Sequence, residues 1–260
     1  MLMVISPAKA LNFAPSPSKA PMTTPVLRQD TAELSLATRR LTARSLRALM
    51  GISDKLARLN RERFQAFDPE SDEGLQAAFA FNGDVYAGLQ AREMDLPALR
   101  WAQDHLRILS GLYGLLRPMD VIQPYRLEMG SRLKTRRGAS LYAFWGDRIA
   151  RELNAAGAGH ADPTLVNLAS QEYFGAVDRS TLTLPLLTCH FKEERAGELA
   201  TLSFFAKRAR GMMARYVIDN RITRTSDIKA FNRDGYAFRS EISSDTDWVF
   251  ARRHIQEPPP

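Results

Sequence analysis

The stretch from Leu106 to Gly138 constrains this chain most, because positive charge and backbone-stiffening residues coincide in it. It holds seven Arg and Lys residues against two carboxylates, and two prolines fix its backbone at intervals. Arginines on a chain stiffened in this way are suited to bidentate binding of phosphate or carboxylate. The stretch therefore predicts an anion-binding surface, with Arg117 and Arg126 as candidate ligands. The competing interpretation is that each arginine pairs with a nearby carboxylate, as Arg126 could with Glu128.

The composition predicts a globular chain of one domain, residues 1–260, or of two intimately packed lobes, with a short tail at residues 257–260. A chain of 260 residues with 45% hydrophobic content can bury a sizeable core. The net charge of +7 and the pI of about 9.7 favour an acidic partner such as nucleic acid, an anionic membrane or a phosphorylated small molecule. No apolar run approaches the roughly 20 residues of a membrane span, so we expect no membrane partner.

The single cysteine, Cys189, excludes an internal disulfide and is typical of a reducing compartment, so we expect a cytoplasmic protein. His190 follows it on a predicted strand, which directs the two side chains to opposite faces. They therefore cannot act together as nucleophile and base. The other histidines show no metal-ligand spacing. We predict no metal site and no cofactor.

The apolar run at residues 1–5 is typical of a buried strand, and residues 165–168 predict a short strand with Asn167 near its end. Ligands often bind where such strands end, so the polar residues that follow them are candidates for a site. Lys9 follows the first run, but a lone lysine there could equally be a solvated loop charge. Asn167 and Ser170 could hold a base or sugar, or could serve as a buried amide and a helix cap. The residues that we expect to position a ligand are Glu128, Asn167, Ser170 and Tyr173.

Residues 202–218 combine an apolar stripe at helical spacing with basic residues on other faces. Lys207 and Arg210 are three apart and project together, so we expect this helix to share one positive cleft with residues 106–138. Residues 27–50 and 97–109 also show helical spacing. Short strands interleaved irregularly with long helices predict an α+β (mixed α/β) fold, a compact globule with a central mixed sheet surrounded by helices.

Seven short signatures follow one another along nearly the whole chain: ISPAK, FNGDVY, SGLYGLLRP, QPYRLEMG, LYAFWG, NLASQEYF and FFAKRARGMMARYVI. Together they resemble the peroxide stress protein YaaA family of bacteria. The resemblance implies a compact α/β globule with a central sheet, binding of duplex DNA, and a role in surviving hydrogen peroxide by limiting free iron and hence oxidative DNA damage. The residues themselves show neither a redox cysteine pair nor ferroxidase ligands, so we expect the effect on iron to be indirect.

The turn at Gly51, followed by Ser53 as a cap for a helix from Asp54, resembles the helix-hairpin-helix module described for some members of that family. In such a module, backbone N–H groups at the start of the second helix bind DNA phosphate without reading bases. Gly51 and Lys55 would make this contact. The alternative is an ordinary helical hairpin, because Ser53 replaces the usual second glycine and Asp54 would crowd the phosphate.

Two functional hypotheses follow. The first is a DNA-binding protein of the hydrogen peroxide stress response, which binds duplex DNA without strong sequence specificity, largely through phosphates in a basic cleft. The second is an enzyme or small-ligand binder that acts on a phosphorylated or nucleobase compound in the same cleft, although no spacing identifies catalytic residues. We expect a monomer in both cases. The candidate DNA- or anion-binding residues are Lys9, Gly51, Lys55, Arg117, Arg126, Lys207 and Arg210.

Overall fold

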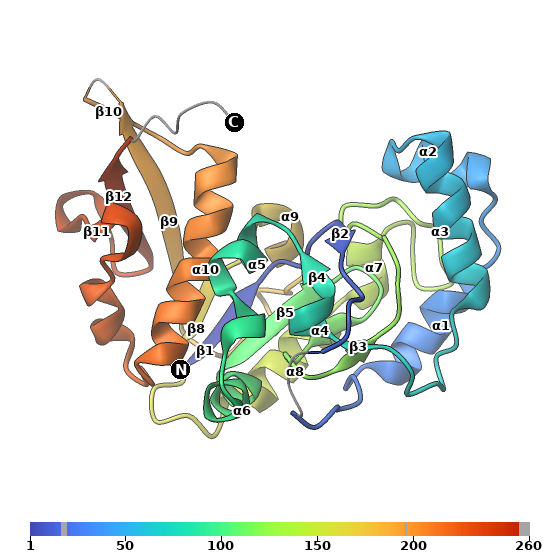
Figure 1. The fold of residues 1–260 in the computed structure, drawn as a ribbon, viewed down its shortest axis with the longest axis horizontal. Helices are drawn as coiled ribbons and strands as arrows, with labels where there is room; N and C mark the ends of the chain where they lie inside the picture. Colours follow the sequence, from blue (N-terminus) through green and yellow to red (C-terminus); the bar gives the residue numbers. More distant parts are fainter. Residues whose placement is uncertain (17–19, 196, 255–260) are drawn as a thin grey trace.

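The computed structural model describes residues 1–16, 20–195 and 197–254, and its centre is an eight-stranded mixed sheet (Figure 1). This confirms the predicted fold class. The predicted tail, residues 257–260, lies outside the described residues. In spatial order the strands are β11 (Ala237–Phe238), β12 (Asp247–Arg253), β9 (Leu186–Arg195), β8 (Leu165–Leu168), β1 (Leu2–Ile5), β5 (Leu106–Ser110) and β6 (Gly114–Leu116), with β10 (Glu198–Ala200) paired to β9.

Strand β1 lies in the middle of the sheet, as its continuous apolar sequence predicts, and its four residues are buried. It runs parallel to β5 and β8, so that Ile5 pairs with Ile108 on one side and with Leu168 on the other. β9 is parallel to β8, and β12 is parallel to β9. These five strands therefore end at the same edge of the sheet, which we call the carboxyl edge.

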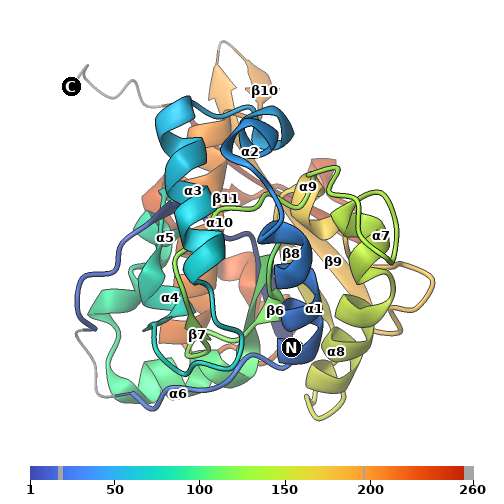
Figure 2. The same cartoon turned by 90° about the vertical axis from the view of Figure 1, so that its right-hand side faces the viewer.

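Helices cover both faces of the sheet (Figures 1 and 2). The 17-residue helix α10 (Ser203–Asp219) confirms the predicted helix over residues 202–218, and it packs on β9, β8 and β1 beside α6 (Leu96–His105). Helix α5 (Asp84–Leu89) packs on α10. On the other side of the sheet lie α7 (Leu141–Trp145) and α8 (Arg148–Gly157), as Figure 2 shows.

Helices α5 and α10 are in contact backbone to backbone. A Cβ atom at Gly211 would lie 1.8 Å from the carbonyl oxygen of Val85, and one at Gly88 would lie 2.1 Å from the carbonyl oxygen of Arg208. Both distances are far below van der Waals contact, so glycine alone fits at these two positions.

The prediction of one helix over residues 27–50 is wrong, because two helices, α1 (Arg28–Thr38) and α2 (Ala43–Met50), occupy this range. Thr42 starts the second helix by accepting a hydrogen bond from the Ser45 backbone N–H at 3.1 Å. After a turn, α3 (Asp54–Ala66) packs against α2. The pair projects at one end of the molecule (Figure 1), and we call it the helical hairpin α2–α3.

The predicted helix over residues 97–109 is wrong in its last four residues. α6 ends at His105, and residues 106–110 form β5. Spacing cannot distinguish a short apolar run in a helix from a buried strand. Here the parallel pairing of residues 106–108 with β1 decides for the strand.

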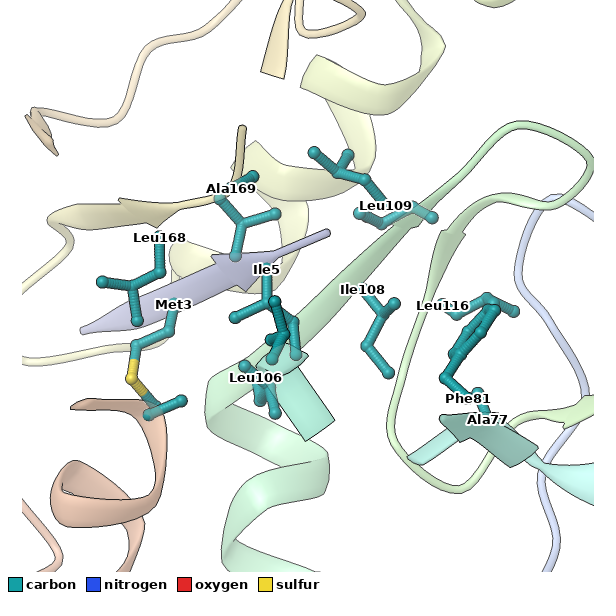
Figure 3. Packing of buried hydrophobic residues seen from close by; sticks show 14 of the residues in the cluster. Met3, Ile5, Ala77, Phe81, Leu106, Ile108, Leu109, Leu116, Leu168 and Ala169 are labelled. Carbon is teal, nitrogen blue, oxygen red and sulfur yellow. The ribbon is translucent and has the colours of Figure 1, made fainter. Parts of the chain in front are cut away.

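The carboxyl edge rests on a tightly packed core (Figure 3). Met3 and Ile5 of β1 are fully buried, as are Leu106 and Ile108 of β5 and Leu168 of β8, each at most 1% exposed. Burial of one such side chain contributes about 1.5–3 kcal/mol relative to leaving it exposed. The strands that carry the site are therefore a rigid support.

The remaining elements are short. Two small sheets pair β2 (Ala10–Leu11) with β4 (Phe81–Asn82) and β3 (Leu75–Gln76) with β7 (Val121–Ile122). Among the described residues, no helix has the length and apolar character that crossing a membrane requires. The other helices are α4 (Ala77–Ala80), α9 (Gln171–Phe174) and the 3-10 turns η1 (Ala91–Glu93), η2 (Thr225–Ala230), η3 (Arg233–Gly235) and η4 (Ser240–Ile242).

Candidate functional site

Two serines are joined at the carboxyl edge, because Ser6 follows β1 and Ser170 comes soon after β8, the strand paired with β1. The Ser170 backbone N–H donates to Ser6 Oγ at 2.9 Å, and the two hydroxyl oxygens lie 3.3 Å apart. Tyr86 of α5 donates its hydroxyl to the Ser6 carbonyl oxygen at 3.2 Å. These bonds fix the start of the turn that carries Lys9.

Residues 125–128 pass over the end of β5. The hydroxyls of Tyr125 and Ser110 are 2.6 Å apart and share a hydrogen bond. Gly111 follows β5, and a Cβ there would lie 2.1 Å from the Leu127 carbonyl oxygen. The absence of a side chain at this position allows the segment to lie directly on the sheet edge.

Arg126 and Glu128 form an ion pair on this segment, where they alternate with the buried Tyr125 and Leu127. Arg126 donates from Nε to Glu128 Oε1 at 2.8 Å, and its Nη2 also lies 2.8 Å from that oxygen. Lys9 Nζ lies 3.9 Å from the same oxygen, with its side chain 67% exposed. Glu128 Oε2 is buried and has no hydrogen-bond partner among the residues that the structure describes. The structure thus brings together three predicted site residues: Lys9, Arg126 and Glu128.

A small pocket, open to solvent, lies at this ion pair. It is a shallow depression whose space of about 220 Å³ includes open solvent, and it is lined by residues 7–9, residues 125–128 and Tyr173. Burial raises the pKa of Tyr125 and of Tyr173, and the nearby Glu128 carboxylate adds to the effect in both cases. Both phenols therefore remain protonated at neutral pH.

Asn167 and Ser170 use their polar groups within the chain. The Asn167 side chain is nearly buried, and its Oδ1 accepts from the Ala169 backbone N–H at 2.9 Å. Ser170 caps α9 by accepting from the Tyr173 backbone N–H at 3.5 Å. Glu172 Oε1 accepts from the Gly130 backbone N–H at 3.0 Å, which ties α9 to the chain beyond Glu128. This is the cap and buried-amide alternative raised for Asn167 and Ser170.

Arg117 lies at the end of the sheet opposite the carboxyl edge. β6 is antiparallel to β5, and Leu116 pairs with Ile108, so Arg117 lies near the start of β5 rather than its end. Its Nη2 is 2.9 Å from Oδ1 of the fully buried Asp120 and donates to the Thr24 carbonyl oxygen at 3.0 Å. The structure therefore does not bring Arg117 together with the cations of the carboxyl edge.

Lys207 and Arg210 lie on α10. Lys207 is exposed, whereas Arg210 is largely buried near Cys189 of β9, and burial lowers its pKa. Burial raises the pKa of the Cys189 thiol to about 12, opposed in part by Arg210. A thiol that stays protonated at neutral pH is a poor nucleophile. Lys9 and Arg126 both form their ion pairs with Glu128. Neither of these two ion pairs includes a residue of α10.

Cys189 and His190 are separated as the sequence predicts. Cys189 is buried, whereas His190 Nε2 lies 2.8 Å from Asp247 Oδ1 near the surface. Among the described residues, no group of three or more His, Cys, Asp or Glu side chains is placed to hold a metal ion.

The helical hairpin α2–α3 is a second concentration of positive charge. The hairpin itself, residues 43–66, contains six Arg or Lys and two acidic residues, a net charge of 6 − 2 = +4. Arg39 and Arg40, just before α2, bring the stretch 39–66 to +6 against +7 for the whole chain. Arg44, Arg58 and Arg61 are exposed on it, as is the predicted Lys55. One ion pair partly offsets this charge, since Arg47 Nη1 lies 3.5 Å from Asp54 Oδ1 with both side chains mostly in water.

The turn of the hairpin has the features that the sequence predicts locally. Gly51 adopts a left-handed conformation with φ of +61°, and a Cβ there would have nothing within 4 Å. Ser53 caps α3 by accepting from the Leu56 backbone N–H at 3.4 Å. Because α2 and α3 also fit an ordinary helical hairpin, this geometry does not confirm a helix-hairpin-helix module.

Sequence reasoning missed three residues that shape the pocket: Ser6, Gly111 and Tyr125. Alternation along QPYRLEMG was the available signal, since an extended segment with Tyr125 and Leu127 inward must turn Arg126 and Glu128 to the same outer side.

Comparison with known proteins gives consistent matches. The family described as Peroxide stress protein YaaA matches residues 1–242. A UPF0246 protein of Caulobacter vibrioides (strain NA1000 / CB15N) is 68% identical over 252 residues, which cover 97% of this chain and 99% of the relative. A UPF0246 protein of Phenylobacterium zucineum is 63% identical over 100% of this chain and 97% of the relative. A UPF0246 protein of Maricaulis maris is 56% identical over 97% of this chain and 96% of the relative.

Proposed function

Because this chain belongs to the peroxide stress protein YaaA family, we propose that it acts in the response to hydrogen peroxide by binding duplex DNA. The binding is to phosphates and has little sequence preference. Any protection from iron-dependent damage would then follow from occupancy of the DNA. The family relationship supports the link to oxidative stress, and the charge distribution described next supports DNA binding.

The observation that carries the proposal is the exposed charge of the helical hairpin α2–α3. Its net charge of +4 lies on a projecting element of two helices, so Lys55 and several arginines can reach the backbone of one duplex. Phosphate neutralisation by such side chains releases counterions and supplies affinity that falls steeply with salt. Backbone N–H groups at the start of the 13-residue helix α3, other than the Leu56 N–H that Ser53 caps, would add a backbone contact beside Gly51.

The proposed DNA contact differs from the cleft that the sequence predicts. Arg117 and Arg126 already have carboxylate partners, and Arg210 is largely buried. Lys9 and Lys207 remain exposed. We therefore place the main contact on the hairpin and give Lys9 and Lys207 a secondary part.

The experiment compares two triple variants that remove the same charge. Arg44→Ala, Lys55→Ala and Arg58→Ala together strip the hairpin, whereas Arg100→Ala, Arg224→Ala and Arg253→Ala remove three exposed arginines elsewhere. Fluorescence anisotropy with a random-sequence duplex is measured from about 50 to about 300 mM salt. This range brackets the salt concentration at which the Debye length is about 10 Å. The hairpin variant should bind at least about tenfold more weakly at 0.1 M salt, with a salt slope shallower by about 2 to 3.

The control variant should keep most of the affinity and nearly the wild-type slope. Equal losses in the two variants would show that only net charge matters, and an unchanged hairpin variant would remove the hairpin from the DNA contact. Either result overturns the proposal.

A further inference from the structure

The two oxygens of the Glu128 carboxylate differ in their hydrogen bonding. Both donors from Arg126 converge on Oε1, and Lys9 also lies nearest that oxygen, at 3.9 Å. Oε2 is buried with no partner in the described part of the chain, in a side chain only 13% exposed. A buried charged acceptor without a donor costs free energy, and native structures rarely keep one unless a ligand or water completes it.

The position of this oxygen connects it with an open pocket. The Glu128 side chain lines the 220 Å³ pocket at the carboxyl edge together with the turn that carries Lys9. The pocket has a rigid base, since the Tyr125 hydroxyl is bonded to Ser110 and the Ser6 turn is bonded to α9 and α5. Ligands of open α/β sheets commonly bind outside the carboxyl ends of the strands, which is where this pocket lies.

Lys9 supplies the second feature of the pocket. Its side chain is 67% exposed and its distance from Glu128 is at the limit of an ion pair, so its ammonium group is free to bind an anion. Arg126 and Lys9 around one carboxylate leave a local charge of 2 − 1 = +1. An anionic group is thus favoured beside Lys9, and an N–H donor is favoured at Glu128.

Aromatic residues supply the third feature. Tyr125 and Tyr173 both line the pocket, but Tyr125 is only 5% exposed, so a flat ring would pack against the partly exposed Tyr173. A ligand that carries a flat ring with N–H donors and an anionic group fits all three features, and a nucleotide is the common molecule of this description.

We propose that the pocket formed by Lys9, Arg126, Glu128 and Tyr173 binds a free nucleoside monophosphate, with the base N–H donor on Glu128 Oε2 and the phosphate on Lys9. This site goes beyond DNA binding and does not depend on it. Its residues lie at the carboxyl edge and not on the hairpin that makes the main DNA contact, and Lys9 alone has a part in both proposals.

The test measures binding of AMP, GMP, CMP and UMP to the full chain by isothermal titration calorimetry, with ribose 5-phosphate as the ligand that lacks a base. At least one monophosphate should bind with a Kd below about 1 mM, a modest affinity for a ligand of this size. Glu128→Gln should weaken that binding at least tenfold and leave the weaker binding of ribose 5-phosphate unchanged.

Glu241→Gln is the matched control. Glu241 also pairs with an arginine two positions earlier, Arg239, but its side chain is 55% exposed and lies outside the pocket. It should bind nucleotide like wild type. Lys9→Ala removes an exposed side chain and should weaken both the monophosphate and ribose 5-phosphate, which keeps the test decisive if Glu128→Gln does not fold.

The proposal is overturned if none of the four monophosphates binds, or if Glu128→Gln binds them as Glu241→Gln does. Anisotropy with the random duplex separates this site from the DNA proposal. Glu128→Gln should leave DNA affinity within twofold of wild type. A parallel loss of DNA affinity would instead mean that the pocket holds a nucleotide of the DNA, and would overturn the assignment to a free ligand.

Discussion

The two arginine-rich stretches of this chain, residues 39–66 and residues 106–138, look alike in sequence and differ in the folded protein. Their net charges are 8 − 2 = +6 and 7 − 2 = +5. In the first, most basic side chains are exposed. In the second, Arg117, Arg126 and Arg137 each meet a carboxylate, while the exposed cations are Arg132, Lys134 and Arg136.

The arginines of residues 106–138 are paired because carboxylates reach them both from nearby in the sequence and from a distant helix. Asp120 and Glu128 are close to their arginines in sequence, but Asp30 and Glu33, the partners of Arg137, come from α1. The rest of the chain carries a net charge of 7 − 6 − 5 = −4, and part of it is used to neutralise residues 106–138. A run of arginines thus identifies a binding surface only after the distant acidic residues have been placed.

The largest effect that tests this comparison is on stability. Arg137→Ala would remove ion pairs to Asp30 and Glu33 and the contact of the guanidinium with the Phe144 ring, 4.6 Å from its centroid. Because Glu33, whose side chain is 35% exposed, loses its arginine while Asp30 keeps Arg148 at 2.9 Å, we expect the free energy of unfolding to fall by about 1–2 kcal/mol. Urea denaturation measures this change, and Arg136→Ala, the exposed neighbour, should change it by less than about 0.5 kcal/mol. Similar losses in the two variants would contradict the distinction between paired and exposed arginines.

A smaller effect concerns the cap of the hairpin. Ser53→Ala removes the acceptor for the Leu56 N–H at the start of α3 and should lower the free energy of unfolding by about 0.5–1 kcal/mol. Ser53→Asn retains a capping oxygen and should stay near wild type in the same denaturation experiment. If both variants lose stability equally, the cap does not hold the start of α3.

The smallest stability effect is expected at Asp54. Asp54→Asn removes an exposed ion pair with Arg47 and a favourable charge in the first turn of α3, so the cost should be about 0.5 kcal/mol. The same change removes a negative charge from the proposed DNA contact and should raise duplex affinity by about two- to fivefold at 0.1 M salt. Anisotropy measures the affinity, and a decrease would contradict a phosphate contact at this turn.

Local sequence predicted the elements that position the pocket. The apolar run at residues 1–5 has the pattern of a central strand, and the strand-end rule then placed Lys9 at the carboxyl edge. The apolar stripe at residues 202–218 predicted α10 within one residue at each end. The signals are local periodicity and burial, which depend little on the rest of the chain.

The parts that could not be predicted depend on contacts between distant residues. Residues 106–109 continue a helical pattern, and only pairing with β1 makes them a strand. The position of Arg117 follows from β6 turning back along β5, which puts it at the edge opposite Lys9. The unpaired Oε2 of Glu128 likewise depends on how the segment at 125–128 lies over Gly111.

The two glycines at the contact between α5 and α10, Gly88 and Gly211, limit how this protein can vary. A single methyl group at either position would meet a carbonyl oxygen of the facing helix and push α5 away from α10. α5 also holds Tyr86, whose hydroxyl supports the Ser6 turn. The absence of a side chain at these two glycines thus sets how near α10 can come to α5 and to the base of the pocket. A homologue with alanine at either position would need a wider spacing between the two helices.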